Sequence, residues 1–466
     1  MSAGLVWFRR DLRDYDHAPL AAALESHDVV HCAFVFDTAI LDPLRGDDAR
    51  VSFILACVKE LDAALRERGG GLHCLHGAAR DEIPRLAHDL GVESVFVGRD
   101  YEPAAVARDE EVAMKLERHG MALRGFKDQV IFEADEVTTG DGKAYSVFTP
   151  YRNAWMKRLR PEDMAERAVA PRAGQLAPGS PVPSLVDLGF DPVELAIDPG
   201  MSAAGRAWKS FQGRIESYAE DRDFPARKAT SGLSAHLRFG TVSIRELVRF
   251  ACKRDDEPRR KWLSELIWRE FYFAALSVRP DSIEHAWNRQ FDSLGWEGDE
   301  ALLDAWREGR TGYPIVDAAM RELAARGTLH NRLRMVTASF LVKDLGIDWR
   351  RGERWFAERL LDYDQAANVG NWQWCASTGS DPQPWFRIFN PVTQSKRFDP
   401  DADYIREWLP ELARVPAKRV HAPWDMSPAE QEAAACMIGR DYPAPVVDHA
   451  QARKKALERY QAAQRP

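Results

Sequence analysis

Apolar and polar positions along the first 130 residues alternate between two patterns. Short apolar runs are separated by longer stretches in which apolar residues recur every three or four positions. The short runs are typical of buried strands, and the longer stretches of amphipathic helices. We expect strands at residues 5–8, 29–36, 72–75, 92–97 and 122–126, with helices that include residues 51–68, 81–90 and 105–119. Strands that alternate with helices in this way predict a doubly wound parallel sheet.

The pattern changes near the middle of the chain. Residues 161–200 contain seven prolines and four glycines, a composition that suits a connecting segment at the surface. From residue 201 onward the periodicity is helical, with helices expected at residues 203–220, 244–253, 259–275, 315–325 and 333–345. We therefore expect three parts: an α/β domain at residues 1–130, a linker at residues 131–200 and a larger all-α domain at residues 201–466.

Composition and charge narrow the class of protein. The chain is 45% hydrophobic and 29% charged, as in globular proteins, and Arg9 and Arg10 interrupt its first apolar stretch. The interruption argues against a signal peptide or a membrane span, so we expect a cytoplasmic protein without a membrane partner. The six cysteines form no CxxC pair, so we expect reduced thiols. Because the formal net charge is -8, any nucleic-acid contact must be a local basic patch.

Thirteen of the fifteen tryptophans lie beyond residue 200, where they can serve as bulky packers of a helical core. One of them, Trp262, shares a helical stripe with Glu265 and Arg269 in the segment KWLSELIWREFYF. The carboxylate and the guanidinium are costly to bury unless they are paired or used. Either a structural ion pair between Glu265 and Arg269 or a functional site explains this stripe.

Two further segments place polar groups among apolar ones. Asn331 and Met335 lie one helical turn apart, which suits either a solvated helix start or a hydrogen-bonding edge that faces a base. Asp362 and Asp364 form an Asp-x-Asp pair ahead of Asn368, but no series of further metal ligands follows and the calcium-loop pattern fails. We therefore expect no metal site.

A series of motifs resembles the cryptochrome/photolyase family over nearly the whole chain. In order, the motifs are VWFRRDLR, RDFP, TSGLSAHL, WREF, GYPIVDAAMR, HNRLRM, DWRRGE, NWQW and RIFNP. Asn368, Glu265 and the HNRLRM motif are similar to those of the class I cyclobutane pyrimidine dimer photolyases, the deoxyribodipyrimidine photo-lyases. The resemblance implies a carbon–carbon lyase that repairs such dimers in DNA with an electron from light-excited, reduced FAD. No GxGxxG follows the first strand, so a dinucleotide-dehydrogenase site is disfavoured there.

The resemblance implies a flavin site made of residues from several motifs. Donors of the TSGLS loop would hold pyrophosphate, Arg269 would balance charge near the reduced flavin, and Asn368 would lie beside the nitrogen of the flavin's central ring. The full set is Tyr218, Thr230, Ser231, Gly232, Leu233, Ser234, Trp262, Glu265, Arg269, Asp362, Tyr363, Asp364 and Asn368.

The same resemblance implies a pocket for a dimer that is flipped out of the duplex. Trp268 and Trp374 would form its aromatic walls, Glu265 and Asn331 would bond the polar edges of the dimer, and Met335 would pack against it. The catalytic set is Glu265, Asn331, Met335, Trp268, Trp374 and Asn368. DNA contacts are implied for Arg222, Trp268, Asn331, Arg332, Arg387 and Gln394, and electron transfer to the flavin for Trp296, Trp349 and Trp372.

A second, light-harvesting chromophore is implied for the first 130 residues. Phe36, Asp37, Arg50, Asp100 and Glu102 resemble the pattern of members that bind 8-hydroxy-deazaflavin. Members that bind methenyl-tetrahydrofolate carry an Asn-Glu pair where this chain has Ala104 and Ala105. The resemblance thus favours 8-hydroxy-deazaflavin over the folate, with an FMN-filled or empty pocket as the alternatives.

Two other functions fit parts of the sequence. A cryptochrome would bind the same cofactor for light signalling, but such proteins often carry a long disordered tail. Here we expect only about 70 residues after the RIFNP motif, ending in a helical stretch at residues 451–464. A nucleotide-binding module without photochemistry would explain the first 130 residues alone. We expect a monomeric repair enzyme whose partner is DNA that contains pyrimidine dimers.

Overall fold

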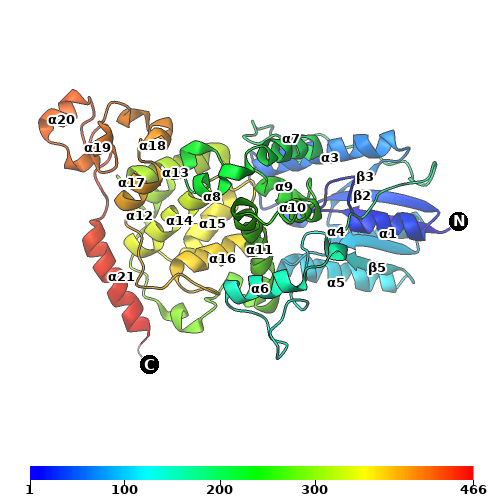
Figure 1. Cartoon of the computed structure of the whole chain (residues 1–466). Helices are drawn as coiled ribbons and strands as arrows, with labels where there is room; N and C mark the ends of the chain where they lie inside the picture. The colour runs from blue at the N-terminus through cyan, green and yellow to red at the C-terminus, as the bar shows by residue number, and fades with distance from the viewer. Residues whose placement is uncertain (465–466) are drawn as a thin grey trace. The chain divides into compact units, whose positions relative to one another are not determined.

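The computed structural model describes residues 1–464, which group into two compact units (Figure 1). The first unit contains Met1–Tyr145, Thr149–Glu216 and Ser231–Val278. The second unit contains Ser146–Phe148, Ser217–Thr230 and the chain from Arg279 onward. The domain boundaries expected at residues 130 and 200 stay a prediction.

A five-stranded sheet forms the centre of the first unit, and its strands are parallel. The strands are β1 (Ala3–Phe8), β2 (Val29–Asp37), β3 (Leu72–Gly77), β4 (Ser94–Gly98) and β5 (Ala122–Phe126), in the spatial order β3-β2-β1-β4-β5. Because β1 has β2 on one side and β4 on the other, the connection from β3 to β4 crosses the sheet. The doubly wound α/β fold is confirmed, and each strand begins and ends close to its predicted bounds.

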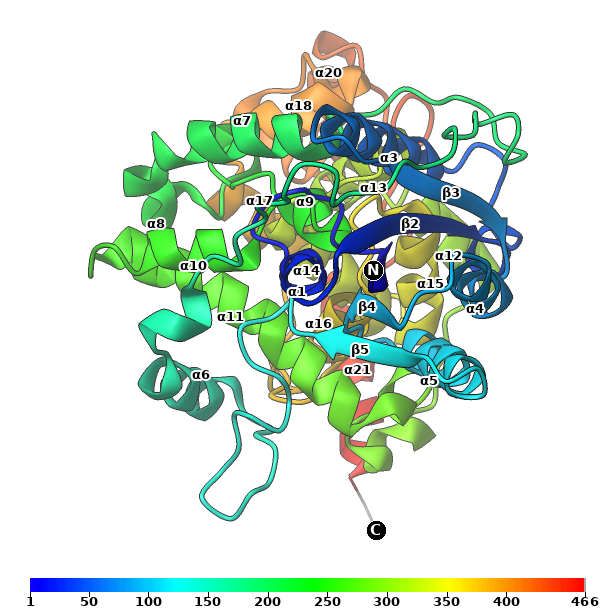
Figure 2. The same cartoon turned by 90° about the vertical axis from the view of Figure 1, so that its right-hand side faces the viewer.

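Alternate residues of each strand face opposite sides of the sheet, and helices cover both sides (Figure 2). Leu5, Trp7 and Val95 pack with Ile83 of α4 (Ala79–Asp89) and Val112 of α5 (Pro103–Glu117). The other side is covered by α1 (Ala18–Ser26) and α3 (Ala49–Glu67). Both faces of the central strands β1, β2 and β4 are largely buried, which explains why these strands form continuous apolar runs in the sequence.

The remaining helices of the first unit are α2 (Thr38–Leu41), between β2 and β3, and several that follow the last strand in the chain. The latter are most of α6 (Phe148–Arg158), η1 (Pro161–Met164), α7 (Gly200–Gln212), α9 (Ser234–Phe239), α10 (Ile244–Ala251) and α11 (Glu257–Val278). The helix expected at residues 203–220 is interrupted. It ends as α7 at Gln212 and is capped by Gly213, because glycine is a poor residue for a helix interior.

The proline-rich segment contains neither helix nor strand between residues 165 and 199, apart from one bridge between Val30 and Leu176. The side-chain amide of Gln175 donates to the carbonyl oxygens of Leu24 and His27 at 2.7 and 2.8 Å. These bonds hold the segment to the end of α1 within the first unit. Both ends of the segment lie in the first unit, and its role as a linker between domains stays a prediction.

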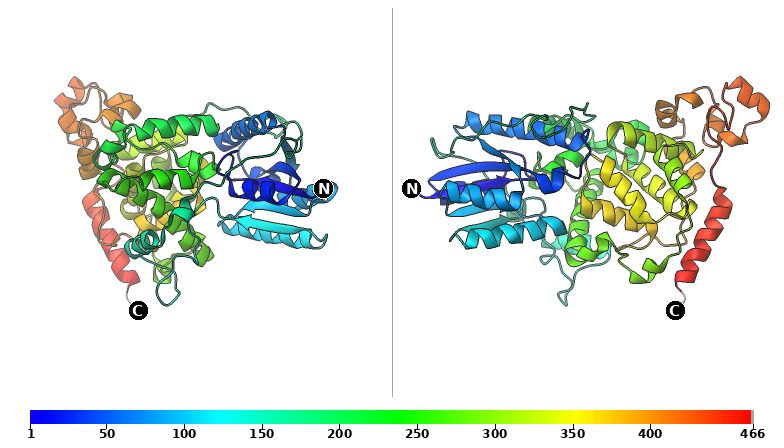
Figure 3. Two further views of the ribbon diagram at one scale, coloured as in Figure 1. Left: turned by 45° about the vertical axis from the view of Figure 1, so that its right-hand side comes forward. Right: turned by 180° about the vertical axis from the view of Figure 1, so that it is seen from behind.

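The second unit is built of helices around one large apolar core (Figure 3). Its helices are α8 (Tyr218–Asp221), α12 (Glu300–Arg307), α13 (Pro314–Arg326), α14 (Asn331–Ser339), α15 (Trp349–Arg359), α16 (Gln365–Ala376), α17 (Pro391–Phe398), α18 (Asp403–Trp408), α19 (Ala417–Val420), α20 (Pro428–Ala433) and α21 (His449–Ala463). Short 3-10 turns lie at η2 (Ile215–Ser217), which links the two units, and at η3 (Pro225–Arg227), η4 (Pro280–Ile283), η5 (Arg289–Ser293), η7 (Pro410–Leu412) and η8 (Pro423–Asp425). The helix expected at residues 333–345 ends as α14 at Ser339 and continues as a π-helix, η6 (Phe340–Asp344).

All six cysteines are free, and four of them are buried. Burial raises the pKa of Cys32, Cys57 and Cys375 to about 12, which keeps these thiols protonated and packed. None of the helices within residues 1–464 combines the length and the apolar character that are needed to cross a membrane.

Candidate functional site

Helix α11 carries the first group of predicted site residues. Trp262 is only 3% exposed, and its indole stacks on Trp208 with ring centroids 5.2 Å apart. Phe211 contacts the same indole at 5.1 Å, and Trp208 in turn donates its indole N–H to Glu246 at 2.9 Å. This aromatic stack fixes the start of α11 in the first unit.

The middle of α11 presents Glu265, Trp268 and Arg269 as half-buried side chains. Arg269 donates to the carbonyl oxygen of Gln129 at 2.6 Å, and its guanidinium lies 4.5 Å from the ring centroid of Phe273. Trp268 is fixed by ring contacts within its own helix. The guanidinium is therefore held in place while part of the predicted stripe remains accessible.

Glu270, one residue after Arg269, has a structural role that the sequence did not reveal. Its carboxylate accepts the backbone N–H groups of Ile131 at 2.7 Å and Phe132 at 3.0 Å, and the indole N–H of Trp155. Burial raises the pKa of Glu270 to about 7, although these hydrogen bonds act in the opposite direction. The glutamate of the WREF motif thus anchors α11 to the segment that follows β5.

The TSGLS loop has a backbone that suits an anion. Gly232 has a φ of +68°, in the left-handed region, and a Cβ at this position would have no heavy atom within 4 Å. Leu233 follows with a φ of -96°, and the N–H of Leu233 is bonded to Ser231 Oγ at 3.4 Å. The left-handed Gly232 puts a tight turn into the loop, and backbone N–H groups in such a turn can form a concave anion site. The loop therefore fits a phosphate group.

The predicted antenna residues of β2 and α3 lie at the carboxyl end of the sheet, where ligands of doubly wound folds bind. Phe36 is buried, and Asp37 accepts the N–H groups of Ala39 and Ala79, each at 3.2 Å. Arg50 bonds Asp48 through Nε at 2.8 Å and Nη2 at 2.5 Å. These contacts fix the local helix starts, so the structure assigns each polar group at least a structural role.

The other two antenna residues belong to an ion network beyond β4. Arg10 Nη1 contacts Asp100 at 3.1 Å and Glu102 at 3.0 Å, and Arg238 contacts Glu102 at 2.9 Å. Burial raises the pKa of Asp100, but the arginines, Arg10 first, outweigh it and hold this pKa well below its usual range. Asp100 is therefore ionised at neutral pH. No ligand identity follows from these contacts, and the antenna assignment stays a prediction.

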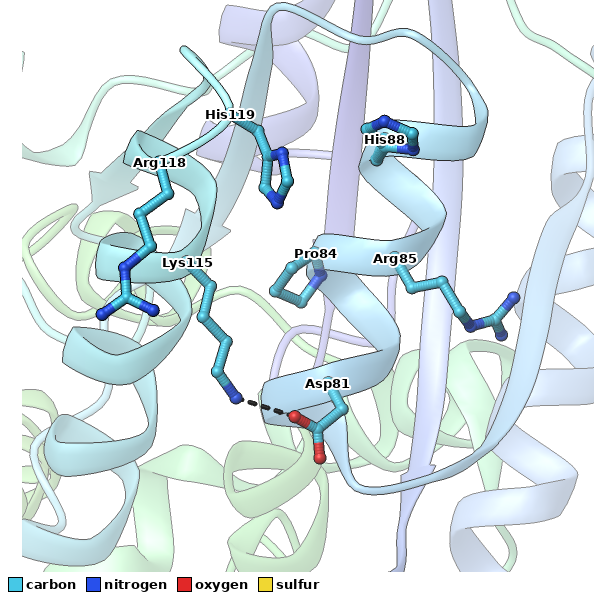
Figure 4. A pocket seen from close by; sticks show the side chains of 7 residues that line it. All are labelled: Asp81, Pro84, Arg85, His88, Lys115, Arg118 and His119. Atoms are coloured by element: carbon cyan, nitrogen blue, oxygen red, sulfur yellow. Dashed lines mark hydrogen bonds and ion pairs between the residues drawn. The ribbon is translucent and has the colours of Figure 1, made fainter.

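A surface groove of about 320 Å³ lies between α4 and α5 (Figure 4). Its lining residues are Asp81, Pro84, Arg85, His88, Lys115, Arg118 and His119. Lys115 pairs with Asp81 at 2.7 Å, and Arg85 pairs with Glu82. None of the predicted antenna residues lines the groove, and acidic partners already compensate much of its positive charge.

Asp11, His17 and Asp128 form a buried cluster whose ligand atoms lie within 4.8 Å of one another. Arg13 and Arg245 contact Asp128 at 2.5 and 2.9 Å. Burial raises the pKa of Asp128, but the two guanidiniums outweigh it and hold that pKa well below its usual range. Because the same guanidiniums repel a cation, this cluster suits a structural ion network better than a metal site.

In the second unit, the two aspartates of the Asp-x-Asp pair have different partners. Asp362 accepts two hydrogen bonds from Arg334 Nη2, at 3.0 and 2.8 Å. Asp364 caps α16 and accepts the N–H of Ala367 at 3.1 Å. The first aspartate therefore fixes a guanidinium, and the second fixes the helix that carries Asn368.

Asn368 is oriented by a carboxylate that the sequence did not single out. Its Nδ2 donates to the carbonyl oxygen of Glu353 at 3.2 Å and to Glu353 Oε1 at 3.0 Å. Tyr363 donates its hydroxyl to the same Oε1 at 3.3 Å. Burial raises the pKa of Glu353, although these hydrogen bonds lower it. Since both amide hydrogens are committed to Glu353, Asn368 has its Oδ1 to offer to a ligand.

Helices α14 and α16 bring together the predicted dimer-binding residues of the second unit. Asn331 Nδ2 lies 3.9 Å from Met335 Sδ, so the two side chains meet along α14 as their spacing predicted. The Cys375 thiol of α16 lies 3.9 Å from the carbonyl oxygen of Met335, which joins the two helices. Trp374, the neighbour of Cys375, is partly buried against the same core. Asn331 is exposed, so a polar edge faces outward.

Two of the predicted DNA-binding arginines share one acidic partner. Arg332 contacts Asp223 at 3.0 Å and Arg222 contacts it at 3.9 Å. The guanidiniums also lie over aromatic rings, Arg332 over Phe398 at 4.3 Å and Arg222 over Tyr218 at 5.4 Å. Ring stacking and the shared carboxylate hold both guanidiniums in place.

The two other predicted DNA-binding residues of the second unit lie in the RIFNP region. Arg387 is exposed in the loop between α16 and α17. Gln394 lies on α17, and its Oε1 is buried without a hydrogen-bond donor among residues 1–464. A buried amide oxygen without a donor is uncommon, so Gln394 has an acceptor available for a ligand.

The three predicted electron-transfer tryptophans belong to one apolar core. Trp349 and Trp372 are 1% and 2% exposed, whereas Trp296 is only partly buried. Gly352 of α15 makes this packing possible, because a Cβ there would lie 2.2 Å from the Trp372 ring and 2.4 Å from Leu341. Two of the three indoles are therefore buried, and Trp296 alone of the three reaches the surface.

Sequence reasoning missed Glu353, Arg334 and Gly352 as parts of the site. All three stand inside quoted motifs, HNRLRM and DWRRGE. Their position inside these motifs was the available sign. Their partners, Asn368, Asp362 and Trp372, lie 15 or more positions away along the chain, so the pairing could not be read from local spacing.

Two family models match the chain. The model described as DNA photolyase matches residues 4–171, and the model described as FAD binding domain of DNA photolyase matches residues 262–462. The deoxyribodipyrimidine photo-lyase of Escherichia coli is 41% identical over 483 positions, which cover 100% of this chain and 100% of that protein.

Solved structures with similar folds include two photolyases and a cryptochrome. A bacterial class III photolyase from Agrobacterium tumefaciens has a TM-score of 0.91 and 34% identity, and the match covers 100% of this chain and 98% of that one. The cryptochrome of Synechocystis has a TM-score of 0.86 and 28% identity, with 98% and 99% coverage. An archaeal photolyase from Sulfolobus tokodaii, solved with two FAD molecules, has a TM-score of 0.83 and 32% identity, with 99% and 100% coverage.

Proposed function

Because the chain belongs to the cryptochrome/photolyase family, as a deoxyribodipyrimidine photo-lyase, we propose that it splits cyclobutane pyrimidine dimers by light-driven electron transfer. The observation that carries the proposal is the orientation of Asn368, whose amide hydrogens are held by Glu353. Photolyases resemble this chain in having asparagine there. The same orientation leaves an oxygen acceptor for the protonated nitrogen of a reduced flavin ring.

Several residues fit an FAD molecule. The left-handed Gly232 and the open space beside it suit pyrophosphate, and Asn368 Oδ1 suits the flavin ring. Arg334, fixed by Asp362, is a positive charge available to a reduced, anionic flavin. When bound, reduced FAD supplies the photoexcited electron that the dimer needs. The side chains of the protein bind and orient the cofactor and the dimer, and they exclude water from the site.

We assign the dimer pocket to the side chains that the family resemblance names. Trp268 and Trp374 are the stacking walls, and both are partly exposed, as a stacking surface must be. Glu265 and Asn331 bond the polar edges of the bases, and Met335 packs beside Asn331 at 3.9 Å. No nucleophile is required, because the electron returns after the ring opens.

The DNA strand itself is assigned to basic side chains of the second unit. Arg222 and Arg332 are held by Asp223 and by aromatic rings, so their guanidiniums are pre-positioned for phosphate. Arg387 is exposed and free to reach a phosphate from its loop. These side chains supply a local basic patch in a chain whose net charge is -8.

Two further parts of the proposal concern light and electrons. Trp372, Trp349 and Trp296 are proposed to carry electrons inward to the flavin, in support of which Trp296 is partly exposed while the other two indoles are buried. The carboxyl end of the sheet is proposed to hold an 8-hydroxy-deazaflavin antenna. The alternative occupant of this antenna site is a flavin, because the archaeal photolyase was solved with two FAD molecules.

Repair is tested by illuminating the reduced protein with an oligonucleotide that contains a thymine dimer. We expect dimers to disappear in the light and to persist in the dark. Dimers that persist in the light, although the DNA binds and the flavin is reduced, would favour a cryptochrome. If the purified protein shows no flavin absorption even after FAD is added, neither the photolyase nor the cryptochrome function is possible.

Two variants separate the roles within the pocket. Glu265→Ala should lower the repair yield with a modest loss of DNA binding, because the carboxyl group acts on the dimer's radical anion. Trp268→Ala should weaken binding of dimer-containing DNA by ~1–3 kcal/mol through lost stacking. Glu265→Gln, which keeps a hydrogen-bond donor, is the matched control. Equal repair by Glu265→Ala and the unchanged protein would rule out the role of Glu265.

A further inference from the structure

The last helix of the second unit places a cation beside Trp296. The guanidinium carbon of Arg459, on α21, lies 5.9 Å from the centroid of the Trp296 ring. The Arg459 side chain is only 7% exposed. Its acidic neighbour, Glu297, lies 3.9 Å away but is 68% exposed, so water weakens that ion pair more than it weakens the contact with the indole.

Arg459 is fixed because α21 is held along η6, at the outer side of the second unit (Figure 3). At the start of α21, His449 contacts Asp344 at 2.5 Å. Near its end, the Tyr460 hydroxyl donates to the carbonyl oxygen of Ala376 at 2.5 Å, and Lys343 Nζ lies 3.6 Å above the Tyr460 ring. Arg459 itself donates to the Val342 carbonyl oxygen at 3.5 Å. The guanidinium is thus positioned by the fold.

A fixed cation acts differently on the two oxidised forms of an indole. Loss of one electron gives Trp296 a full positive charge, which the guanidinium repels at this separation. Loss of the indole N–H proton then gives a neutral radical, for which this repulsion disappears. Arg459 therefore favours the neutral radical over the radical cation. With the intact indole the same contact is attractive, so Arg459 also packs stably in the resting protein.

We propose that Arg459 is a positioning residue that drives Trp296 to release its proton after oxidation, and so holds the transferred electron on the flavin side. The inference rests on the proposed tryptophan chain. When bound and photoexcited, oxidised FAD would supply the oxidant. Trp372 would give up one electron, Trp349 would then reduce Trp372, and Trp296 would reduce Trp349. The Trp296 N–H proton passes to water. A soluble thiol later returns one electron, and water one proton, to the Trp296 radical.

The proposal is tested by transient absorption of the FAD-loaded protein after a light flash, which distinguishes the tryptophan radical cation from the neutral radical. Replacing Arg459 with methionine keeps the side-chain length and removes the charge. We expect Arg459→Met to lengthen the lifetime of the radical cation roughly tenfold. Without the repulsion from Arg459, the equilibrium constant for loss of the indole proton should fall by a factor on the order of ten or more. Arg459→Lys, which keeps the charge, should stay within about threefold of the unchanged protein.

A second variant makes the electrostatic potential at Trp296 more positive without changing any residue of α21. Glu297→Gln removes the exposed carboxylate that partly compensates Arg459, so it should shorten the lifetime of the radical cation. A purely structural role for Arg459 predicts no such shortening. Equal lifetimes in Arg459→Met and the unchanged protein, or a longer lifetime in Glu297→Gln, would overturn the proposal.

The same measurement separates this inference from the tryptophan chain on which it rests. Trp296→Phe should abolish the long-lived radical if Trp296 is the last donor. If Trp296→Phe leaves the long-lived radical unchanged, the chain itself is wrong, and Arg459 loses its role with it. If Trp296→Phe abolishes the radical while Arg459→Met and Glu297→Gln change nothing, the chain stands and only the role of Arg459 is wrong.

Discussion

Glu353 shows how one carboxylate can decide the chemistry of another side chain. An asparagine amide can present either its oxygen or its NH2 group to a ligand, and the two choices suit different partners. Here the Glu353 carbonyl and carboxylate oxygens both accept from Asn368 Nδ2, at 3.2 and 3.0 Å. The carboxylate therefore decides which end of the amide meets the flavin.

Replacing Glu353 with leucine should weaken FAD binding about tenfold, because the buried Asn368 amide loses an acceptor worth ~1–3 kcal/mol. Glu353→Gln keeps an oxygen acceptor and should stay within about threefold of the unchanged protein. Titration of flavin-free protein with FAD, followed by flavin fluorescence, measures both. Equal affinities in all three proteins would contradict the orienting role.

Titration of Glu270 should make the free energy of unfolding depend on pH. Its pKa is raised from 4.5 to about 7 in the folded protein, mainly by burial. Between these values the folded protein binds more protons at Glu270 than the unfolded chain does. The contribution of this group to stability is therefore fully present below about pH 4.5 and is lost as the pH rises through about 7.

Glu270→Gln removes the titration while keeping a side chain of the same shape. Relative to this variant, the unchanged protein should lose on the order of 3 kcal/mol of unfolding free energy as the pH rises from 4.5 to 7, at about 1.4 kcal/mol per pKa unit. Urea unfolding of both proteins at pH 5 and pH 8, followed by tryptophan fluorescence, measures the change. A difference that is the same at both pH values would show that Glu270 does not titrate in this range.

At the scale of elements, the packing of α15 on α16 depends on one residue without a side chain. Gly352 lies where a Cβ would overlap both the Trp372 ring and Leu341. Its backbone is not in the left-handed region, so the requirement for glycine comes from space and not from conformation. The two helices can therefore hold a fully buried tryptophan between them.

Gly352→Ala should destabilise the protein by about 1–3 kcal/mol and slow photoreduction of the flavin, because the new methyl group displaces Trp372. Gly205 of α7 is the matched control, since a Cβ there has no heavy atom within 4 Å. Gly205→Ala should be neutral or up to about 1 kcal/mol stabilising. Thermal unfolding compares the two, and equal transition temperatures would contradict the steric account.

Element boundaries were harder to predict than element types. The helix pattern at residues 203–220 continues past Gly213, but the structure ends α7 there. The pattern at residues 333–345 is unbroken, yet its last turn forms the π-helix η6. Periodicity reports which residues face a core, whereas the exact hydrogen-bond partners depend on what packs against the helix.

At the scale of the whole molecule, a net charge of -8 coexists with proposed binding to DNA. Many of the acids are bound locally to arginines, as Asp223 is to Arg332. Each phosphate that a basic side chain neutralises releases counterions, so its contribution appears in the salt dependence of affinity. The net charge therefore predicts no long-range attraction to DNA, and individual arginines must carry the binding.

Arg387→Ala should weaken DNA binding and lower the slope of log affinity against log salt by about 0.9, because one phosphate contact is lost. Arg118, the exposed C-cap residue of α5, lines the groove in Figure 4 and serves as the control. Arg118→Ala should leave the slope unchanged. Binding of dimer-containing DNA at several salt concentrations measures both slopes, and equal slopes for the two variants would place Arg387 outside the DNA contact.

The sequence by itself determined the parallel α/β sheet, the helical second half and membership in a family of flavin-dependent repair enzymes. These features follow from local periodicity and from the order of motifs along the chain, and both can be recognised without knowing which distant residues meet. Only the tertiary structure decided that Glu353 orients Asn368, that Gly352 admits Trp372 and that Arg459 lies over Trp296. These pairings join residues far apart along the chain, and their distances arise when the helices pack around a shared core.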